Sequence, residues 1–439
     1  MRCFMKDDSR KVVKGDTFIS LTDNEEYIKD AINRGASKII CKNGIYNVNT
    51  INVDDPRLYL EKYLDDLYKE KFNQIKIIGI TGTNGKTTSS YLLWQILNKL
   101  DIKCGYIGTI GFYIKDKIRN LNNTTPDMLD LYNMINECID NECSYVVMEI
   151  SSQALSYNRI GRLLFDYAVF TNLTEDHLDY HKDIKSYALA KQKLFYHVKN
   201  KAIINYDDIN KYYFMLDIND NIEYGFDGGD YHITEYSLGS ISKFRLNNKL
   251  YITNLIGKYN IYNLLISIII LDLENIIYNK DILKELKYPD GRMDIIKYRN
   301  NKIIIDYAHT PDGVRNVIST VKELNSNKII TILGCGGDRD SSKRSIMGAI
   351  STSLSDYVVF TNDNPRHENE LSIIDDIIQN IDTDNYEIIT NREKAIIKGI
   401  QMLGENDILL VLGKGHEDYQ IIGDKKLPFS DKETVLKNI

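Results

Sequence analysis

Three features that would assign this sequence to a particular class of protein are missing. No run of ~18 apolar residues occurs, and the first residues, MRCFMKDDSRK, lack the apolar core of a signal peptide. The cysteines show no CxxC spacing, which argues against a zinc site and against a disulfide framework. The six cysteines are Cys3, Cys41, Cys104, Cys138, Cys143 and Cys335. We therefore expect a cytoplasmic protein without a membrane anchor.

An excess of basic residues is also missing. The 439 residues carry a net charge of −7, so the chain has no general attraction for nucleic acid. Apolar residues make up 43% and charged residues 27%, which is typical of a globular protein. The length allows about two to four domains. We expect small-molecule partners and a monomer.

The most informative stretch is KIIGITGTNGKTTSSYLLWQILNKL, residues 76–100. A β-branched run passes through a glycine loop into a segment with apolar residues at helical spacing. Backbone N–H groups of such a loop can surround a phosphate, Lys86 can reach the outer phosphates, and the Thr87 hydroxyl can hold Mg²⁺. The strict pattern places a glycine at position 80, where this chain has Ile80. An ordinary glycine-rich turn is the alternative, and we interpret the stretch as a nucleotide phosphate site.

The coarse pattern predicts an α/β protein of three domains. These are a small α/β unit (1–72), a central phosphate-loop unit with a mostly parallel sheet and flanking helices (73–290), and a C-terminal, Rossmann-like doubly wound sheet (291–439). Charged residues 65–71 are interpreted as a linker, and the polar stretch from 206 to about 242 as irregular. The predicted strands are 16–21, 37–41, 75–80, 104–109, 145–150, 167–172, 202–205, 302–306, 328–334, 356–361, 386–390 and 407–413. The predicted helices are 27–33, 127–140, 186–198 and 263–273.

Two polar positions follow buried strands of the central unit. Glu149 ends an apolar run and would be well placed to bind Mg²⁺ beside the phosphate loop, although a surface glutamate is the alternative. His177 and His181 share a loop with three acidic residues, and one of them is expected to contact metal or phosphate. Lys191 stands in a helical segment, where a solvated lysine is the usual outcome.

Glycine-rich or polar loops end the strands of the third unit. They are residues 306–312, 334–340, 362–366 and 413–417. Both of the first two loops could bind a nucleotide or an anion, and a simple turn is the alternative for the second. Arg366 offers a fork for a carboxylate, and Glu417 offers a partner for an ammonium group. A substrate that carries both groups, an amino acid, would suit them.

Taken together and in order, these stretches resemble the Mur ligase family, the ATP-dependent amide-bond ligases of peptidoglycan (cell wall) biosynthesis. The likeness is greatest to the members that add the third residue of the stem peptide, and it runs nearly end to end. Its motifs are DSRKVVKGDTF, GITGTNGKTT, NNTTPD, MEISSQAL, FTNLTEDHLDYH, YALAKQKLF, GKYNIYN, GRMD, DYAHTPDG, LGCGGDRDSSKR, TNDNPR and GKGHEDYQ.

The resemblance implies three domains, with ATP and Mg²⁺ as cofactors. Lys86, Glu149, His177 and Lys191 would be catalytic, and Mg²⁺ would lie near Thr87, Glu149 and His177. Lys191 matches the lysine that the family carbamylates, which would make it an anionic metal ligand. The ATP contacts would be Gly82, Thr83, Asn84, Gly85, Lys86, Thr87, Thr88, Asn263, Arg292 and Asp306.

The resemblance also implies an acceptor, UDP-N-acetylmuramoyl-L-alanyl-D-glutamate, and an incoming diamino acid. Arg366 is the feature associated with meso-2,6-diaminopimelate, because it can pair with the distal carboxylate of that molecule. The acceptor would contact Ser9, Asn123, Thr124, Thr125, Ser151 and Arg159. The amino acid would contact Arg339, Asp363, Asn364, Arg366, Gly413 and Glu417.

Three alternatives stay open at this point. The same chemistry could add L-lysine, or a related ligase could act on a different acceptor. A nucleotide-binding regulatory protein without ligase activity is a third reading. A dehydrogenase is excluded, because no GxGxxG follows the first strand of either sheet.

Overall fold

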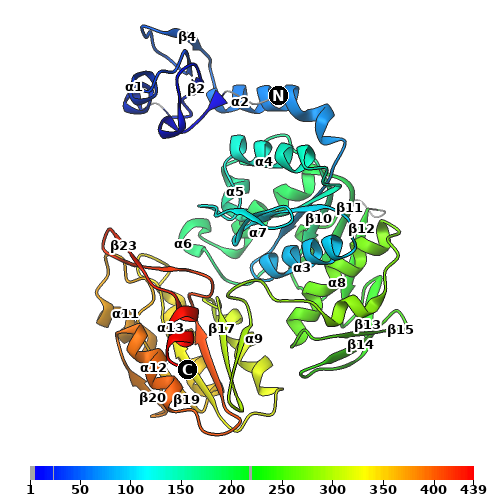
Figure 1. The fold of residues 1–439 in the computed structure, drawn as a ribbon, viewed down its shortest axis with the longest axis vertical. Coiled ribbons are helices and arrows are strands. Elements are labelled where there is room, and N and C mark those ends of the chain that lie inside the picture. Colours follow the sequence, from blue (N-terminus) through cyan, green and yellow to red (C-terminus); the bar gives the residue numbers. More distant parts are fainter. Residues whose placement is uncertain (1–4, 23, 217–219) are drawn as a thin grey trace.

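The computed structural model describes residues 5–22, 24–216 and 220–439. It shows an α/β protein whose three main sheets follow one another along the long axis of the molecule, with the N-terminal sheet at one end and the C-terminal sheet at the other (Figure 1). The predicted fold class is confirmed. In the described ranges no helix has both the length and the apolar character needed to cross a bilayer. Cys3 lies outside the described residues, and the other five cysteines are buried free thiols.

The N-terminal sheet is parallel and has the order β1-β2-β3-β4. Its strands are Met5–Lys6, Thr17–Ile19, Lys38–Cys41 and Asn49–Asn52. Helix α1 (Glu25–Asn33) begins after Asn24, whose side chain caps the N–H of Glu26.

Helix α2 (Pro56–Phe72) contradicts the predicted linker, because residues 65–71 are helical. Its buried residues Leu60, Leu64, Tyr68 and Phe72 recur every four positions and form one apolar face. The rings of Tyr68 and Phe72 pack in tilted contacts against Tyr132 of helix α4 (Met128–Asp140). The charges that suggested a linker are the outer face of an amphipathic helix that packs on the central unit.

The central sheet has eleven strands in the order β15-β14-β13-β12-β11-β10-β5-β9-β6-β7-β8. The seven strands from β13 to β6 run parallel, and antiparallel strands extend the sheet at both ends. Strands β5 to β11 are Lys76–Thr81, Cys104–Gly108, Gly111–Tyr113, Lys117–Arg119, Tyr145–Glu149, Phe165–Phe170 and Val198–Asn205.

Helices cover both faces of this sheet. Alternate residues of β9 point in opposite directions: Val146 and Met148 pack in the layer with α4, and Val147 packs in the layer with α3 and α8. The α-helices are α3 (Lys86–Lys99), α4 (Met128–Asp140), α5 (Ser152–Ser156), α6 (Leu178–His181), α7 (Ile184–Gln192) and α8 (Lys258–Leu273).

The stretch predicted to be irregular up to residue 242 contains regular strands, apart from residues 217–219, which are not described. Strands β12 to β15 are Asn221–Gly225, Tyr231–Ser237, Ser242–Leu246 and Lys249–Thr253. In β14, buried Ser242, Phe244 and Leu246 alternate with exposed Lys243 and Arg245. The polar residues therefore occupy the solvent face of a sheet, which composition alone does not distinguish from a loop.

The C-terminal sheet has the order β16-β17-β21-β18-β19-β20. Only the edge strand β16 is antiparallel, and the other five correspond to the five predicted strands. Strands β16 to β21 are Asp294–Tyr298, Asn301–Asp306, Ile329–Leu333, Tyr357–Phe360, Tyr386–Ile388 and Ile408–Leu412. The remaining elements are the hairpin β22 (Tyr419–Ile422) and β23 (Lys425–Pro428) and the helices α9 (Pro311–Lys322), α10 (Ser342–Leu354), α11 (Glu370–Ile378), α12 (Arg392–Gln401) and α13 (Asp431–Lys437).

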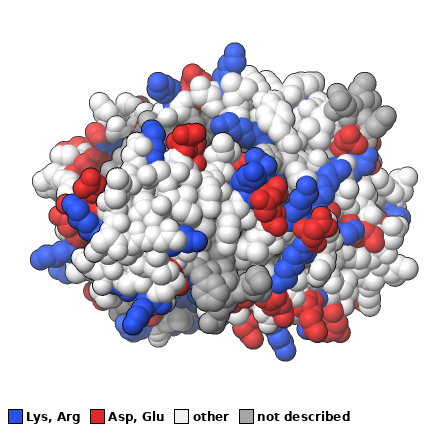
Figure 2. All heavy atoms as spheres, turned by 90° about the horizontal axis from the view of Figure 1, so that it is seen from above, with Lys and Arg blue, Asp and Glu red and all other residues white. Residues whose placement is uncertain are grey.

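Charges of both signs are mixed over the face shown in Figure 2. Basic and acidic side chains alternate there at short range, in keeping with the net charge of −7. That face therefore offers no broad basic surface of the kind that nucleic acid requires.

Candidate active site

The loop between β5 and α3 has a backbone that only glycine can adopt without strain. Gly82 has φ 150° and Gly85 has φ 88°, and a Cβ on Gly82 would lie 1.9 Å from Thr171 Oγ1. Gly85 is the N-cap of α3 and supplies no side-chain cap. The first N–H groups of α3 can therefore face an anion, in the geometry typical of a phosphate site.

Two lysines, half-buried Lys86 and buried Lys191, converge on this loop. Lys86 Nζ donates to Gly82 O and Thr83 O at 2.8 Å, and Lys191 Nζ donates to Gly82 O at 2.8 Å. Burial lowers the pKa of Lys86, and burial together with the charge of Lys86 lowers the pKa of Lys191 well below its usual range. The amines of Lys86 and Lys191 therefore meet at Gly82 O, and positive charge at this point would favour the binding of an anion.

The expectation that Lys191 is solvated is wrong, since its side chain is 1% exposed. It lies on α7 beside the buried residues Ala188 and Ala190, and its ammonium nitrogen is 4.3 Å from the centre of the Tyr187 ring. Small residues let the helix approach the phosphate loop closely, so the lysine points inward.

Glu149 is fully buried at the end of β9 and is held by four hydrogen bonds. Thr87 Oγ1 and Thr109 N each donate at 2.8 Å, Thr109 Oγ1 donates at 3.1 Å, and the Tyr106 hydroxyl donates to Oε1. All four donors are neutral, so none of them cancels the carboxylate charge. A buried anionic oxygen beside a threonine hydroxyl fits a hard divalent cation such as Mg²⁺.

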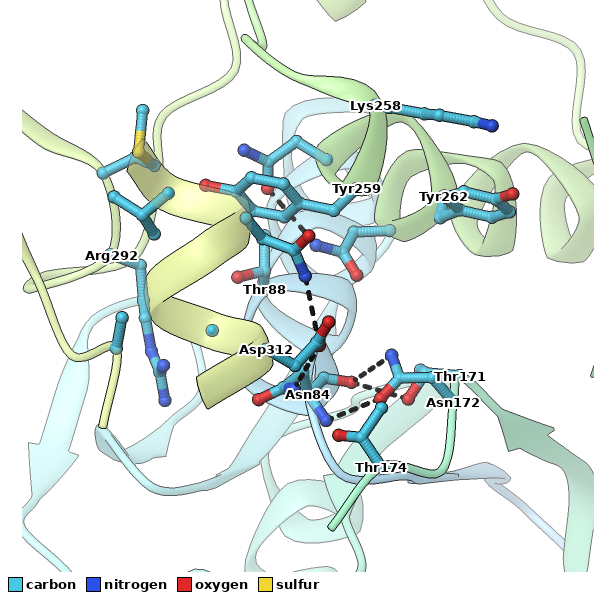
Figure 3. Close-up of a pocket in the computed structure, with 18 of the residues that line it drawn as sticks. Asn84, Thr88, Thr171, Asn172, Thr174, Lys258, Tyr259, Tyr262, Arg292 and Asp312 are labelled. Atoms are coloured by element: carbon cyan, nitrogen blue, oxygen red, sulfur yellow. Dashed lines mark hydrogen bonds between the residues drawn. The ribbon is translucent and has the colours of Figure 1, made fainter. Parts of the chain in front are cut away.

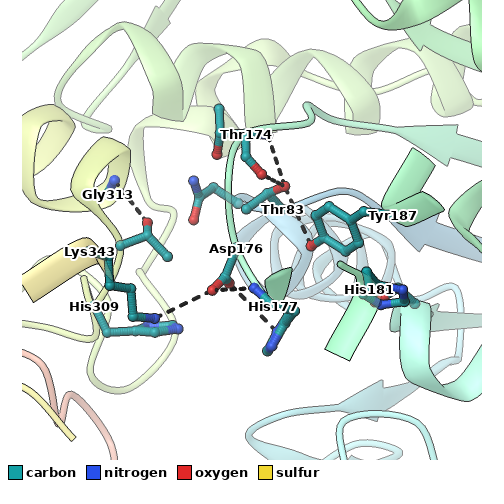
Figure 4. Close-up of polar contacts among 12 residues, drawn as sticks. Thr83, Thr174, Asp176, His177, His181, Tyr187, His309, Gly313 and Lys343 are labelled. Carbon is teal, nitrogen blue, oxygen red and sulfur yellow. Dashed lines mark hydrogen bonds and ion pairs between the residues drawn. The ribbon is translucent and has the colours of Figure 1, made fainter. Parts of the chain in front are cut away.

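Asp176, which follows β10, is the centre of a charged cluster that joins the central and C-terminal units (Figure 4). Its carboxylate lies 3.4 Å from Lys343 Nζ and 3.6 Å from His177 Nε2. Although burial opposes ionisation, electrostatic interactions with His309, His177 and Lys343 hold the pKa of Asp176 below its usual value. Burial lowers the pKa of His177, with help from Lys86, Lys191 and Lys343, so the neutral imidazole can act as a metal ligand.

His181 does not line the cavity that contains His177. Its Nε2 lies 2.8 Å from Ser152 Oγ, and both side chains are buried. Of the two histidines between which the sequence could not choose, His177 is therefore the one that faces the loop.

Three loops of the C-terminal unit meet because they follow parallel strands. The carboxyl ends of β18, β19 and β21 lie at one edge of the sheet, and each continues into one of the predicted polar loops. Six predicted residues line one cavity there, namely Arg339, Asp363, Asn364, Arg366, Gly413 and Glu417.

Arg366 is fixed in a left-handed backbone conformation (φ 52°). Its Nη1 donates to Gly337 O at 2.6 Å, which holds the guanidinium against the glycine-rich loop. Fully buried Lys414 donates to Asn364 Oδ1 and Glu417 Oε2, each at 3.1 Å. The guanidinium of Arg366 and the carboxylate of Glu417 therefore line the same pocket.

A cavity of about 450 Å³ combines these loops with the phosphate loop. Its lining comes from both units, so neither unit makes it alone. The predicted residues that line it, besides the six named above, are Thr83, Asn84, Gly85, Lys86, Thr87, Thr88, Asn123, Thr124, Glu149, Ser151, Arg159, His177, Lys191 and Arg292.

A second cavity of about 320 Å³ adjoins the first and shares Asn84, Gly85 and Arg292 with it (Figure 3). The predicted nucleoside contacts Asn263, Arg292 and Asp306 all line it. Burial raises the pKa of Asp306, whose carboxylate accepts the N–H groups of Met293 and Ala308 at 2.8 Å. The two cavities therefore lie side by side at the start of α3.

Three predicted residues line neither cavity. Thr125 is buried behind Ser151, where its Oγ1 accepts the N–H of Ser151 at 3.0 Å. Gly82 belongs to the loop itself, and its carbonyl oxygen accepts from Lys86 and Lys191. Ser9 is buried in the N-terminal unit, at the start of the short 3-10 helix Ser9–Lys11.

Sequence reasoning missed Lys343, His309, Lys414 and Asp312 as residues of this site. All four stand inside motifs that were recognised: His309 and Lys414 in the loops after β17 and β21, and Asp312 and Lys343 in the first turns of α9 and α10. The motif spacing places the loop, but it does not show which side chain turns inward.

Comparison with known proteins identifies the family. The model of the Mur ligase middle domain matches residues 80–271, and that of the Mur ligase glutamate ligase domain matches residues 291–415. The chain belongs to the Mur ligase family. The UDP-N-acetylmuramoyl-L-alanyl-D-glutamate–2,6-diaminopimelate ligase of Clostridium botulinum is 38% identical to this Mur ligase over 450 residues, covering 98% of this chain and 93% of the relative. The ligase of the same name from Fusobacterium nucleatum is 41% identical over 453 residues, with the same shares covered.

Solved structures agree with this assignment. A structure of a UDP-N-acetylmuramoyl-L-alanyl-D-glutamate–2,6-diaminopimelate ligase matches with a TM-score of 0.69 and 29% identity, over 99% of this chain and 94% of that one. MurF ligase from Thermotoga maritima in complex with ADP shares the fold, with a TM-score of 0.71 and 17% identity over 100% of this chain and 98% of that one.

Proposed function

We propose that this Mur ligase joins meso-2,6-diaminopimelate to UDP-N-acetylmuramoyl-L-alanyl-D-glutamate with ATP, a step of peptidoglycan synthesis. The observation that carries the proposal is a single cavity lined by the phosphate loop of one unit and by Arg366 and Glu417 of another. The printed names of the relatives support the same substrates. We further propose the domain limits 1–72, 73–290 and 291–439, with Ser9 contacting the UDP end of the acceptor.

ATP would bind with its phosphates at residues 82–88 and its nucleoside in the smaller cavity. Lys86 and the N–H groups of α3 would stabilise charge on the transferring phosphoryl group. Asn263, Arg292 and Asp306 line the nucleoside side. The ADP complex of a ligase of the same fold supports this use of the nucleotide.

Thr87, Glu149, His177 and Lys191 as a carbamate would hold Mg²⁺, which neutralises phosphate charge when bound. Burial and the charge of Lys86 lower the pKa of Lys191, which favours the neutral amine, the form that can take up CO₂. The carbamate would place an anion beside the Lys86 ammonium group, which meets the Lys191 side chain at Gly82 O. The two opposite charges would then attract each other.

The proposed reaction has two steps. The γ-phosphoryl group moves from ATP to the glutamyl carboxylate, which gives ADP and an acyl phosphate. The amino group of the diamino acid then attacks the acyl carbon, loses a proton and expels phosphate. Arg366 would pair with the distal carboxylate and Glu417 with an ammonium group, so that the attacking amine is aimed across the cavity. Exclusion of water between the two units would protect the acyl phosphate.

The test is an ADP-release assay with the UDP-dipeptide, run in parallel with meso-2,6-diaminopimelate, L-lysine and L-ornithine. We expect release that depends on both substrates and is fastest with meso-2,6-diaminopimelate. Equal release without any amino acid would contradict the ligase mechanism. Faster release with L-lysine would overturn the assigned amino acid but not the ligase chemistry. Amide formation only on another acceptor would overturn the assigned acceptor.

A further inference from the structure

One tyrosine in the smaller cavity has a buried hydroxyl group that no atom of the described residues satisfies. The Tyr288 hydroxyl accepts the N–H of Ile256 at 2.6 Å, the Tyr224 hydroxyl donates to Phe170 O at 3.2 Å, and that of Tyr262 donates to Asp207. Tyr259 lines the same cavity, and its buried hydroxyl has no hydrogen-bond partner among the described residues.

The polar neighbour of this hydroxyl, Asn260, directs its hydrogen bonds elsewhere. Asn260 donates from Nδ2 to Ile256 O at 2.8 Å, and its Oδ1 accepts from Asn263 Nδ2 at 3.2 Å. Polar groups buried in native proteins are rarely left without a partner, because the loss of water is then uncompensated. An unsatisfied hydroxyl on the wall of a cavity therefore indicates a partner on the ligand.

The surroundings of Tyr259 indicate which part of a nucleotide that partner is. The residue stands in the first turn of α8 and packs against the core of the C-terminal unit (Figure 3). Its charged neighbours are Asp306 and Arg292. A carboxylate at the end of a parallel strand is a common partner of ribose hydroxyls, whereas the base needs no charged group.

We infer that the Tyr259 hydroxyl hydrogen-bonds a ribose hydroxyl of the bound nucleotide and so helps this chain to select ribonucleotides. The inference rests on the proposed use of ATP. It adds to the proposed site a residue that positions the sugar, beside Asp306.

The first test compares Tyr259→Phe with Tyr278→Phe by calorimetric titration with ADP and by thermal unfolding without nucleotide. Tyr278 is a matched control, because its hydroxyl is also buried without a hydrogen bond of good geometry, beside Tyr251, but lies outside both cavities. Neither substitution removes a bond within the free protein, so both variants should unfold at or above the wild-type temperature. Only Tyr259→Phe should bind ADP more weakly, by about fivefold, the loss of one neutral hydrogen bond. Unchanged ADP binding in Tyr259→Phe would overturn the inference.

The second test identifies the partner with 2′-deoxy-ADP and 3′-deoxy-ADP. One of the two should bind the wild type about fivefold more weakly than ADP, and Tyr259→Phe should abolish that difference. If Tyr259→Phe weakens ADP and both deoxy nucleotides by the same factor, the ribose assignment is overturned. Absence of ADP binding by the wild type would instead refute the proposed ATP site, which separates the two failures.

Discussion

Asn84 of the phosphate loop donates a hydrogen bond from Nδ2 to Asp312 Oδ2 at 2.9 Å, and the two residues belong to different units and stand 228 positions apart. The backbone N–H of Asn84 donates to Asn172 Oδ1 at 2.9 Å, which holds the residue within the central unit. The contact ties the first turn of α9 directly to the loop that would hold phosphate (Figure 3).

We predict that Asp312→Ala weakens the binding of ATP. Removal of the carboxylate leaves the half-buried Asn84 amide without its acceptor and frees the loop, which should raise KM for ATP about fivefold to tenfold. Steady-state kinetics at saturating amino acid measure this change. Ser319→Ala, at an exposed position of the same helix, should leave KM unchanged. An equal rise in both variants would mean that α9 itself had been damaged.

Arg366→Lys should impair the diamino acid selectively. The bidentate fork is lost while the positive charge remains, so we expect KM for meso-2,6-diaminopimelate to rise about 30-fold or more. Residual activity with L-lysine, which lacks the distal carboxylate, should hardly change. Lys425→Ala, on the exposed hairpin strand β23, serves as the control. A similar loss with both amino acids would show that Arg366 supports the pocket without reading the carboxylate.

Lys191→Ala should lower kcat by about 100-fold or more, because the variant cannot form the carbamate that would serve as a metal ligand. Short carboxylates such as formate or acetate should restore part of the activity, since they can fill the space with an anionic oxygen. Lys193→Ala, two positions along the chain and exposed, should behave as the wild type. Full activity of Lys191→Ala would remove the carbamate from the mechanism.

Two histidines should make the fold sensitive to mild acid. Burial lowers the pKa of His309 and of His416 to about 4. Since an unfolded imidazole titrates near pH ~6.5, the unfolded chain takes up protons that the folded chain refuses. Their contribution is complete above that pH and falls by up to about 1.4 kcal/mol per pH unit for each histidine as the pH drops toward 4.

Urea unfolding at several pH values between 5 and 7 measures how the free energy of unfolding depends on pH above the two folded-state pKa values. His416→Gln should flatten the slope of unfolding free energy against pH. His367→Gln is the control, because Asp338 and Asp424 raise the pKa of that exposed histidine. Its contribution is complete at acid pH and is lost only as the pH rises through the raised value, so the acid slope should persist. An unchanged slope in His416→Gln would refute the assignment.

The helices and strands that carry strong local signals were predictable. The phosphate loop, Glu149 at a strand end and the polar loops of the C-terminal sheet follow from apolar periodicity and glycine placement, which act over a few residues. Residues 65–71 show the limit of such reasoning, because charge density alone does not distinguish a linker from the outer face of a helix. The strands between 221 and 253 were missed for the same reason.

The sequence by itself determined the α/β alternation, the loop that only glycine can form, and the motifs that place the chain among the Mur ligases. Tertiary structure alone decided that Lys191 turns inward to Gly82, that Asp176 meets Lys343, and that the Tyr259 hydroxyl stays unsatisfied. Backbone conformation depends on near neighbours along the chain. Burial and pairing of a side chain depend on segments that can lie more than a hundred residues away, and only the packed units bring these together.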